Sequence, residues 1–223
     1  MVIGAGALLG GAGLPGVGPA ERRVVVDPAQ PPWRALGRVQ TELGTRCTGF
    51  LVGPREVLTA AHCLFLSGPR HYAQPGSVHF LLGYAFGSYA AHARVVSYTI
   101  ARGYDPLREA ATAGADRAVL VLAVPLGTPD RVLTLAAPVG AAVALGGYGQ
   151  DREEAVDADL HCRITGLARD GEGRPLLRHD CSATRGTSGA PLLAASADGW
   201  IAVGLQIAAS VGGAGGLAVP LGP

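Results

Sequence analysis

The stretch Leu58-Thr59-Ala60-Ala61-His62-Cys63 places a histidine directly after a run of β-type residues and beside a cysteine. The chain has 6 histidines, and none of the others has so constrained a setting. A general base must be held closely in position, so a fixed loop suits catalysis. The alternative is an ordinary loop histidine, which this stretch alone does not exclude.

Short β-type runs extend outward from this stretch in both directions, with Gly, Pro or Asp between most of them. The nearest runs cover residues 47–52 and 56–59, and Gly53-Pro54-Arg55 forms the turn between them. Many short strands separated by turn residues predict an all-β sandwich or a pair of barrels. One short helix is expected at 60–65. The other expected strands cover 78–82, 93–100, 118–124, 132–135, 141–145, 162–165, 190–193, 200–207 and 217–219.

The composition favours a folded domain without a nucleic-acid partner. Apolar residues make up 48% of the 223 positions and charged residues only 16%, which suits a packed core rather than disorder. The net charge is +1 without a long basic run, so the electrostatic signature of a nucleic-acid binder is missing.

The first residues, 2–20, are apolar and rich in glycine, and they resemble the remainder of a secretory signal, although no Lys or Arg precedes them. Pro15 and Pro19 interrupt this segment, which argues against a stable membrane span. We therefore expect a secreted or periplasmic protein.

The four cysteines fall into two local pairs, Cys47 with Cys63 and Cys162 with Cys181. An even count with local pairing predicts two disulfides and an oxidising compartment. Zinc is the alternative, because histidines lie beside several of these cysteines. The usual spacing of zinc ligands is missing, however, and we expect no metal site. Residues 170–173 predict a hairpin turn at an Asp-Gly pair, with too few acids for an EF-hand calcium loop.

Two further segments carry residues suited to nucleophilic catalysis. Asp116 directly precedes the apolar run 118–122; a partly buried carboxylate needs a donor, and an imidazole N–H can provide one. A turn aspartate is the alternative. Gly186-Thr187-Ser188-Gly189-Ala190-Pro191 sets a serine between glycines. Such a loop can bend tightly and aim N–H groups at an oxyanion, although it also suits an ordinary turn.

Taken together, residues 47–52 and 58–63, Asp116 and residues 186–191 resemble the chymotrypsin/trypsin-like serine peptidases, including that family's order of His, Asp and Ser. The resemblance covers roughly residues 36–220. It implies an all-β fold of two six-stranded antiparallel β-barrels with the active site in the cleft between them. We expect a signal-like leader and N-terminal arm at 1–35, a first barrel at 36–128 and a second at 129–223.

The resemblance also implies the catalytic roles. Ser188 would attack the scissile carbonyl, His62 would act as base and then acid, and Asp116 would orient the imidazole. The N–H groups of Gly186 and Ser188 would form the oxyanion hole. The expected protein is a secreted monomeric serine endopeptidase that acts on polypeptides through an acyl-enzyme, without a cofactor. A catalytically silent binding relative and a serine esterase are the alternatives.

The sequence departs from the common family pattern in two places. Thr187 stands where many members carry an aspartate that pairs with a newly cut N-terminus. We therefore predict that such a cut does not switch this protein on, and that the protein is closer to the bacterial V8-like branch or to related secreted bacterial enzymes. In the expected specificity pocket no carboxylate stands at Ser182, which favours a neutral, small or apolar residue before the scissile bond. The expected substrate-binding residues are Ser182, Ala183, Thr184, Arg185, Gln206, Ile207 and Ala208.

Two side chains near this pocket have open interpretations. Glu-specific relatives use a histidine near the position of Gln206, and His179 is interpreted as a surface residue rather than a substitute. Arg185 could meet an acidic group on a substrate or be a solvated residue at the rim.

Overall fold

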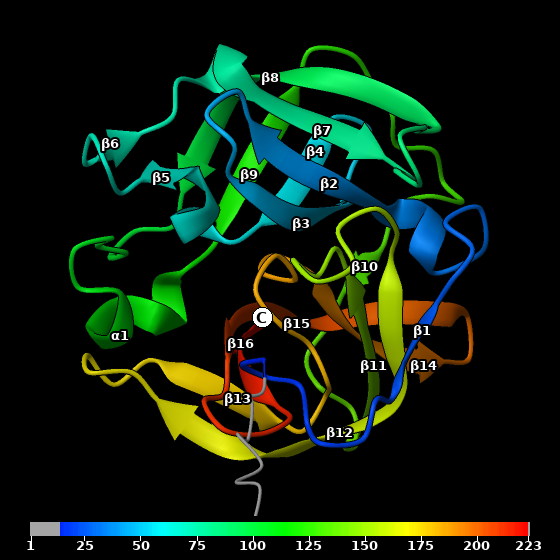
Figure 1. Ribbon diagram of the computed structural model, residues 1–223, viewed down its shortest axis with the longest axis vertical. Helices are drawn as coiled ribbons and strands as arrows, with labels where there is room; N and C mark the ends of the chain where they lie inside the picture. The colour runs from blue at the N-terminus through cyan, green and yellow to red at the C-terminus, as the bar shows by residue number, and fades with distance from the viewer. Residues whose placement is uncertain (1–13, 223) are drawn as a thin grey trace, which may run out of the picture.

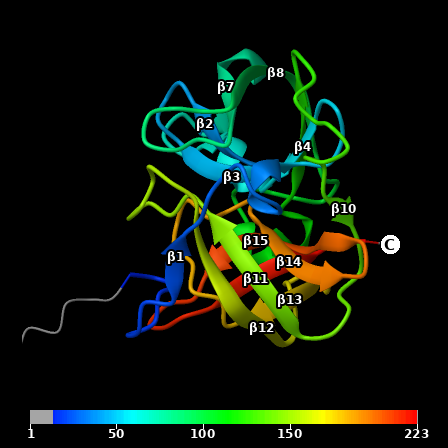
Figure 2. The same ribbon diagram turned by 90° about the vertical axis from the view of Figure 1, so that its right-hand side faces the viewer.

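The computed structural model describes residues 14–222, which form two β-barrels stacked on one another (Figure 1). The view turned by 90° shows the same division, with the first barrel above and the second below (Figure 2). The expected all-β fold of two closed six-stranded antiparallel barrels is therefore confirmed. In the first barrel, β9 (Ala118–Leu122) alternates buried and partly buried residues, as a half-buried strand requires.

The first barrel closes through antiparallel pairing of six strands around buried Phe50, Phe80 and Leu120. In the order in which they pair, the strands are β2 (Leu36–Thr41), β3 (Arg46–Leu51), β4 (Glu56–Thr59), β9 (Ala118–Leu122), β8 (Ala91–Ile100) and β7 (Val78–Leu82).

The second barrel closes because β12 pairs with β13 as well as with β11. Its six strands are β11 (Ala142–Gly147), β12 (Asp157–Arg169), β13 (Pro175–His179), β14 (Pro191–Ser196), β15 (Gly199–Ala209) and β16 (Gly216–Pro220). Two further strands add to this sheet: β1 (Arg23–Val25) runs antiparallel to β12, and β10 (Thr134–Leu135) runs parallel to β15.

Short elements connect the strands. The helix expected at 60–65 is a single 3-10 turn at Ala61–Leu64, and β13 was not among the expected strands. The remaining short elements are β5 (Phe65–Leu66), β6 (His71–Tyr72), α1 (Glu109–Thr112) and 3-10 turns at Trp33–Ala35, Pro75–Ser77 and Ala113–Ala115.

The topology brings two expected catalytic residues to one end of the first barrel. Strands β4 and β9 are antiparallel neighbours, with Thr59 opposite Ala118. His62 follows the end of β4 and Asp116 precedes the start of β9. Both side chains therefore leave the barrel at the same edge, facing the second barrel.

The N-terminal arm joins the second barrel through β1. Residues 1–13 of the expected signal-like leader lie outside the described residues, and the division at residues 35 and 128 remains a prediction. Within 14–222, no helix combines the length and the hydropathy that crossing a membrane would need.

Candidate active site

His62 and Asp116 form a close, doubly bonded pair. The His62 Nδ1 lies 2.6 Å from Asp116 Oδ2, and the backbone N–H of His62 donates to Oδ1 at 2.9 Å. Asp116 is buried, with 5% of its surface exposed, whereas the imidazole is partly open to the cleft. Because the carboxylate holds Nδ1–H, the Nε2 atom is left as the basic nitrogen.

The environment of His62 makes it a stronger base than usual. Burial lowers its pKa, but the hydrogen bond that His62 donates to Asp116 and the charges of Asp116 and Glu109 outweigh that effect, so the pKa of His62 lies above its ordinary value of 6.5. An imidazole beside a buried carboxylate is well suited to accept a proton and hold it briefly.

The loop that carries Ser188 packs against the segment that carries His62. The carbonyl oxygen of Ser188 lies 3.9 Å from the sulfur of Cys63 and accepts a 2.9 Å hydrogen bond from the N–H of Thr48. Gly189, with φ of +84°, leaves no room for a side chain, since a Cβ there would lie 2.1 Å from the Thr48 oxygen. Within the described residues the Ser188 hydroxyl makes no hydrogen bond to His62.

The peptide group between Arg185 and Gly186 is oriented by a backbone hydrogen bond. The Arg185 carbonyl accepts from the N–H of Gln150 at 2.7 Å. The C=O and N–H of a trans peptide point in opposite directions, so the N–H of Gly186 is turned away from Gln150. Neither Gly186 nor Ser188 donates its N–H to another backbone group within residues 14–222. Both donors are therefore available to a ligand, as an oxyanion hole requires.

Thr48 fixes this loop from the first barrel, and the sequence did not single it out. Its side chain is fully buried, its Oγ1 donates to the Gly186 carbonyl at 3.0 Å, and the same Oγ1 accepts from the N–H of Tyr148 at 3.0 Å. Its own carbonyl accepts from the Thr59 hydroxyl at 2.7 Å. One residue of β3 thus ties the serine loop to both barrels.

The two disulfides join the expected pairs, Cys47 with Cys63 and Cys162 with Cys181. Within residues 14–222, the two groupings that could present metal ligands are built on these bonded sulfurs. The first bridge ties the turn carrying His62 to β3, and the second ties β12 to the segment before Ser188. Each closes a short loop and so restricts the unfolded chain.

The expected substrate-binding residues divide into buried and exposed groups. Arg185 and Ala208 are exposed. Ala183 donates its N–H to the carbonyl of Gly16 at 3.0 Å, so the start of the described chain lies against this wall. The buried members are Ser182, Ala183, Thr184, Gln206 and Ile207.

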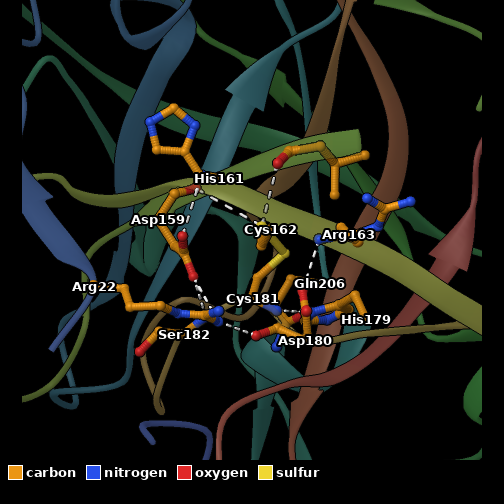
Figure 3. Close-up of a disulfide and its surroundings, with 11 residues drawn as sticks. Arg22, Asp159, His161, Cys162, Arg163, His179, Asp180, Cys181, Ser182 and Gln206 are labelled. Atoms are coloured by element: carbon orange, nitrogen blue, oxygen red, sulfur yellow. Dashed lines mark hydrogen bonds and ion pairs between the residues drawn. A yellow bond between two sulfur atoms is a disulfide. The ribbon is translucent and has the colours of Figure 1, made fainter. Parts of the chain in front are cut away.

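His179 is buried at 4% exposure, so the interpretation of it as a surface residue was wrong. Its Nδ1 accepts from the N–H of Cys181 at 3.2 Å, and its Nε2 contacts the side-chain oxygen of Gln206 at 2.6 Å (Figure 3). Burial lowers the pKa of His179 although the bond to Gln206 opposes this, which favours a neutral imidazole. Residues 27 positions apart make this pair, so local sequence patterns gave no signal for it.

Asp170 is a second residue whose role the sequence did not show. It starts the hairpin turn expected at 170–173, and its side chain accepts from the N–H groups of Glu172 and Arg174. The same carboxylate accepts from the N–H of Gly114 at 3.0 Å. A turn of the second barrel therefore holds the segment that leads into Asp116.

Comparisons with known proteins agree with the double-barrel fold. A family model described as a trypsin-like peptidase domain matches residues 47–205. A glutamyl endopeptidase of Bacillus licheniformis is 25% identical over 143 residues, which are 61% of this chain and 42% of that protein. The match therefore spans less than half of that relative's length. A solved structure of a Glu endopeptidase in complex with MPD has the same fold, with a TM-score of 0.74, 19% identity, and coverage of 92% of this chain and 94% of the other.

Proposed function

This chain belongs to the family of trypsin-like peptidase domains, and we propose that it is a secreted serine endopeptidase with Ser188, His62 and Asp116 as its catalytic triad. The observation that carries this assignment is the His62–Asp116 pair, 2.6 Å apart at the edge of the first barrel and beside the loop of Ser188. The stability of the fold does not require His62 and Asp116 to lie beside the loop of Ser188, so their placement there favours a catalytic role.

In the proposed reaction the Ser188 hydroxyl attacks the carbonyl carbon of the substrate while His62 Nε2 takes its proton. Asp116 keeps the imidazole in the required tautomer and stabilises the imidazolium. The N–H groups of Gly186 and Ser188 receive the negative charge that develops on the carbonyl oxygen, and each such donor is worth about 3 kcal/mol in the transition state.

His62 then passes the proton to the leaving amine, the C–N bond breaks, and an ester of Ser188 remains. Water, deprotonated by the same imidazole, attacks this ester and releases the acid. Every step uses protein groups alone, so the proposal includes no cofactor. The two disulfides and the relation to a glutamyl endopeptidase support secretion.

Residues 182–184 and 206–208 are proposed to bind the residue before the scissile bond, while the exposed Arg185 lies at the rim of this wall. The relative's name says that it acts at glutamyl residues. Here Gln206 presents its side-chain oxygen to His179 and its Nε2 to the Ala208 carbonyl at 3.1 Å. No cation stands among residues 182–184 and 206–208, so we propose a neutral, small or apolar residue before the scissile bond.

Labelling with a fluorophosphonate probe tests the triad. The wild-type protein should be labelled, Ser188→Ala should lose the label, and Ser67→Ala, in an exposed turn, should keep it. Label retained by Ser188→Ala would contradict the assignment. Hydrolysis of casein and of p-nitrophenyl esters then separates the alternatives: an esterase would cleave only the esters, and a silent binding relative would cleave neither.

A further inference from the structure

We propose that a pocket lined by Arg38, Arg46 and Arg185 binds an acidic side chain of the substrate on the leaving-group side of the scissile bond. This inference rests on the proposed function, because it places the pocket relative to Ser188. It goes further by naming a chemical class of substrate.

The pocket adjoins the expected oxyanion hole. Its volume is about 260 Å³, and its wall includes Gly186 and Arg185 from the serine loop, Gln150 from the second barrel, and Arg38 and Arg46 from β2 and β3. A peptide whose carbonyl oxygen meets the N–H of Gly186 would therefore pass directly over its mouth.

A second cavity identifies which side of the bond this pocket serves. That cavity, of about 390 Å³, is lined by His62, Asp116, Ile207 and Ala208. In the proposed function, β15 at 207–208 lies along the acyl part of the substrate. The arginine pocket contains none of these residues and lies beyond Gly186. It therefore faces the chain that leaves as the amine.

The pocket carries a net positive charge. Arg46 forms an ion pair with Glu153, whose carboxylate is the only acidic group in its wall. Nearby Glu154 accepts from the Tyr84 hydroxyl at 2.7 Å and is not in the wall. Three guanidinium groups against one carboxylate leave a formal charge of +2.

Arg38 is buried without a carboxylate partner, which is unusual for a cation. It is 6% exposed, its guanidinium lies 3.6 Å above the centre of the Tyr84 ring, and it donates to the Gln40 side chain and the Glu153 backbone carbonyl. It forms no ion pair with any residue of 14–222. A buried charge without a counterion favours an anionic ligand.

Arg185 lies at the rim of the pocket. It is exposed and makes no ion pair within the described residues, while its backbone is fixed by Gln150. A guanidinium held at the rim can close over a carboxylate in a bidentate pair. An aspartate or glutamate one or two residues after the scissile bond would meet Arg185 first and Arg38 below it.

The test starts from any peptide that the wild-type protein cleaves. The two residues after the scissile bond are replaced in turn by Glu, Gln and Lys, and kcat/KM is measured. We expect Glu to exceed Gln by about tenfold, with Lys lowest, and the difference to shrink at high salt. Equal rates for Glu and Gln would overturn the proposal.

The charge-reversal variant Arg185→Glu takes the formal charge of the pocket from +2 to 0 and should abolish the preference for Glu over Gln and Lys; Arg185→Gln leaves +1 and should only reduce it. Arg102→Glu is the matched control, since Arg102 is exposed and lines a separate cavity with Leu58 and Leu135. The same shift in both charge-reversal variants would contradict a local effect. Failure of the wild type to cleave any peptide, or to be labelled by fluorophosphonate, would instead reject the proposed function.

Discussion

At the scale of single residues, the site depends on groups that no catalytic motif contains. The serine loop is shaped by the hydroxyl of Thr48 and by the backbone N–H of Gln150, which fix the carbonyl groups of Gly186 and Arg185. Hydrogen bonds to two successive carbonyls leave the loop little rotational freedom. We expect these bonds to take the place of the ion pair that the family resemblance implies for members with an aspartate at the position of Thr187.

Replacing Thr48 by valine keeps its shape and removes its hydroxyl. The carbonyl of Gly186 and the N–H of Tyr148 would then lack a partner inside the protein, at a cost of about 1–3 kcal/mol. We expect kcat to fall about tenfold or more with little change in KM, because the oxyanion hole acts mainly on the transition state. Thr48→Ser should retain most of the activity; equal losses in both variants would point to packing instead.

The pH profile should report the raised pKa of His62. The imidazole must be neutral to act as base, so kcat/KM should rise with pH through a midpoint above 6.5. In Asp116→Asn, the carboxylate that raises the pKa of His62 is gone, and burial then lowers that pKa. The midpoint of the pH profile should therefore move to lower pH, while kcat falls about 10⁴-fold. A profile on an ester substrate measures both, and an unchanged midpoint would contradict the role of Asp116.

The same shift has a consequence for stability. The pKa of folded His62 is raised, so the His62–Asp116 pair stabilises the folded state below the unfolded histidine pKa of about 6.5. That contribution disappears as the pH rises through the folded value. Activity and this part of the stability therefore change in opposite directions with pH.

The residues of the candidate triad could be proposed from sequence because each lies in a short motif whose neighbouring residues already suggest its role. Thr48 and the His179–Gln206 pair could not, since their hydrogen bonds join residues far apart in the chain, such as Thr48 and Gly186. A buried histidine with two polar partners has the same local sequence as an exposed one. Burial is decided by the fold, which is why His179 was misplaced.

At the scale of elements, the turn between β12 and β13 contacts the other barrel beside the site. Its Asp-Gly pair predicted the turn, and Gly173 adopts φ of +82° there. The contact of Asp170 with Gly114 could not be predicted, because it depends on how the barrels stack. β13 escaped prediction because residues 175–179 place two leucines together between polar residues, without the alternation expected of a strand.

Replacing Asp170 by asparagine should weaken this bridge. Burial raises the pKa of Asp170, but hydrogen bonds from Arg174, Gly114 and Glu172 lower it further, so the net pKa is lowered. Such a group stabilises the fold above its unfolded pKa of about 3.9 and loses that effect as the pH falls through the folded value.

We expect Asp170→Asn to lose about 2 kcal/mol of unfolding free energy at pH 7 and less at pH 3. Urea unfolding at both pH values measures this loss. A several-fold lower kcat should accompany it, because Gly114 leads into Asp116. A loss of equal size at both pH values would contradict a role for the charged carboxylate.

At the scale of the whole molecule, the two closed six-stranded barrels were predictable from the family resemblance, and most of their strands from the short apolar runs. The attachment of the N-terminal arm was not. Arg23 of β1 is 5% exposed and pairs with Glu21 at 3.0 Å, Asp151 at 2.7 Å and Asp157 at 3.0 Å. This network fastens the arm to the second barrel.

Replacing Arg23 by glutamine should remove the nearer of the two cations beside buried Asp157, because only Arg152, 3.8 Å away, would remain. Burial already raises the pKa of Asp157 to about 6, although Arg23 opposes this. A raised carboxyl pKa favours folding at acid pH, and the benefit is lost as the pH rises through about 6. Arg23→Gln should therefore lose about 3–5 kcal/mol at pH 8 and clearly less at pH 5.

Urea unfolding at both pH values checks this prediction, with Arg94→Gln as the control. Arg94 and Glu42 form an exposed pair 3.6 Å apart, whose loss should cost less than about 1 kcal/mol at either pH. If Arg23→Gln loses the same unfolding free energy at pH 5 and pH 8, the loss does not come from the charge of Asp157.

The hydrogen bonds that Thr48 and Gln150 make to the serine loop also bear on when this protein can begin to work. A loop braced by a freshly cut amine waits for a second protease. Here the braces come from the two barrels themselves, so the loop takes its shape when the barrels meet. If the proposed function holds, completion of folding and formation of the oxyanion hole would then be a single event.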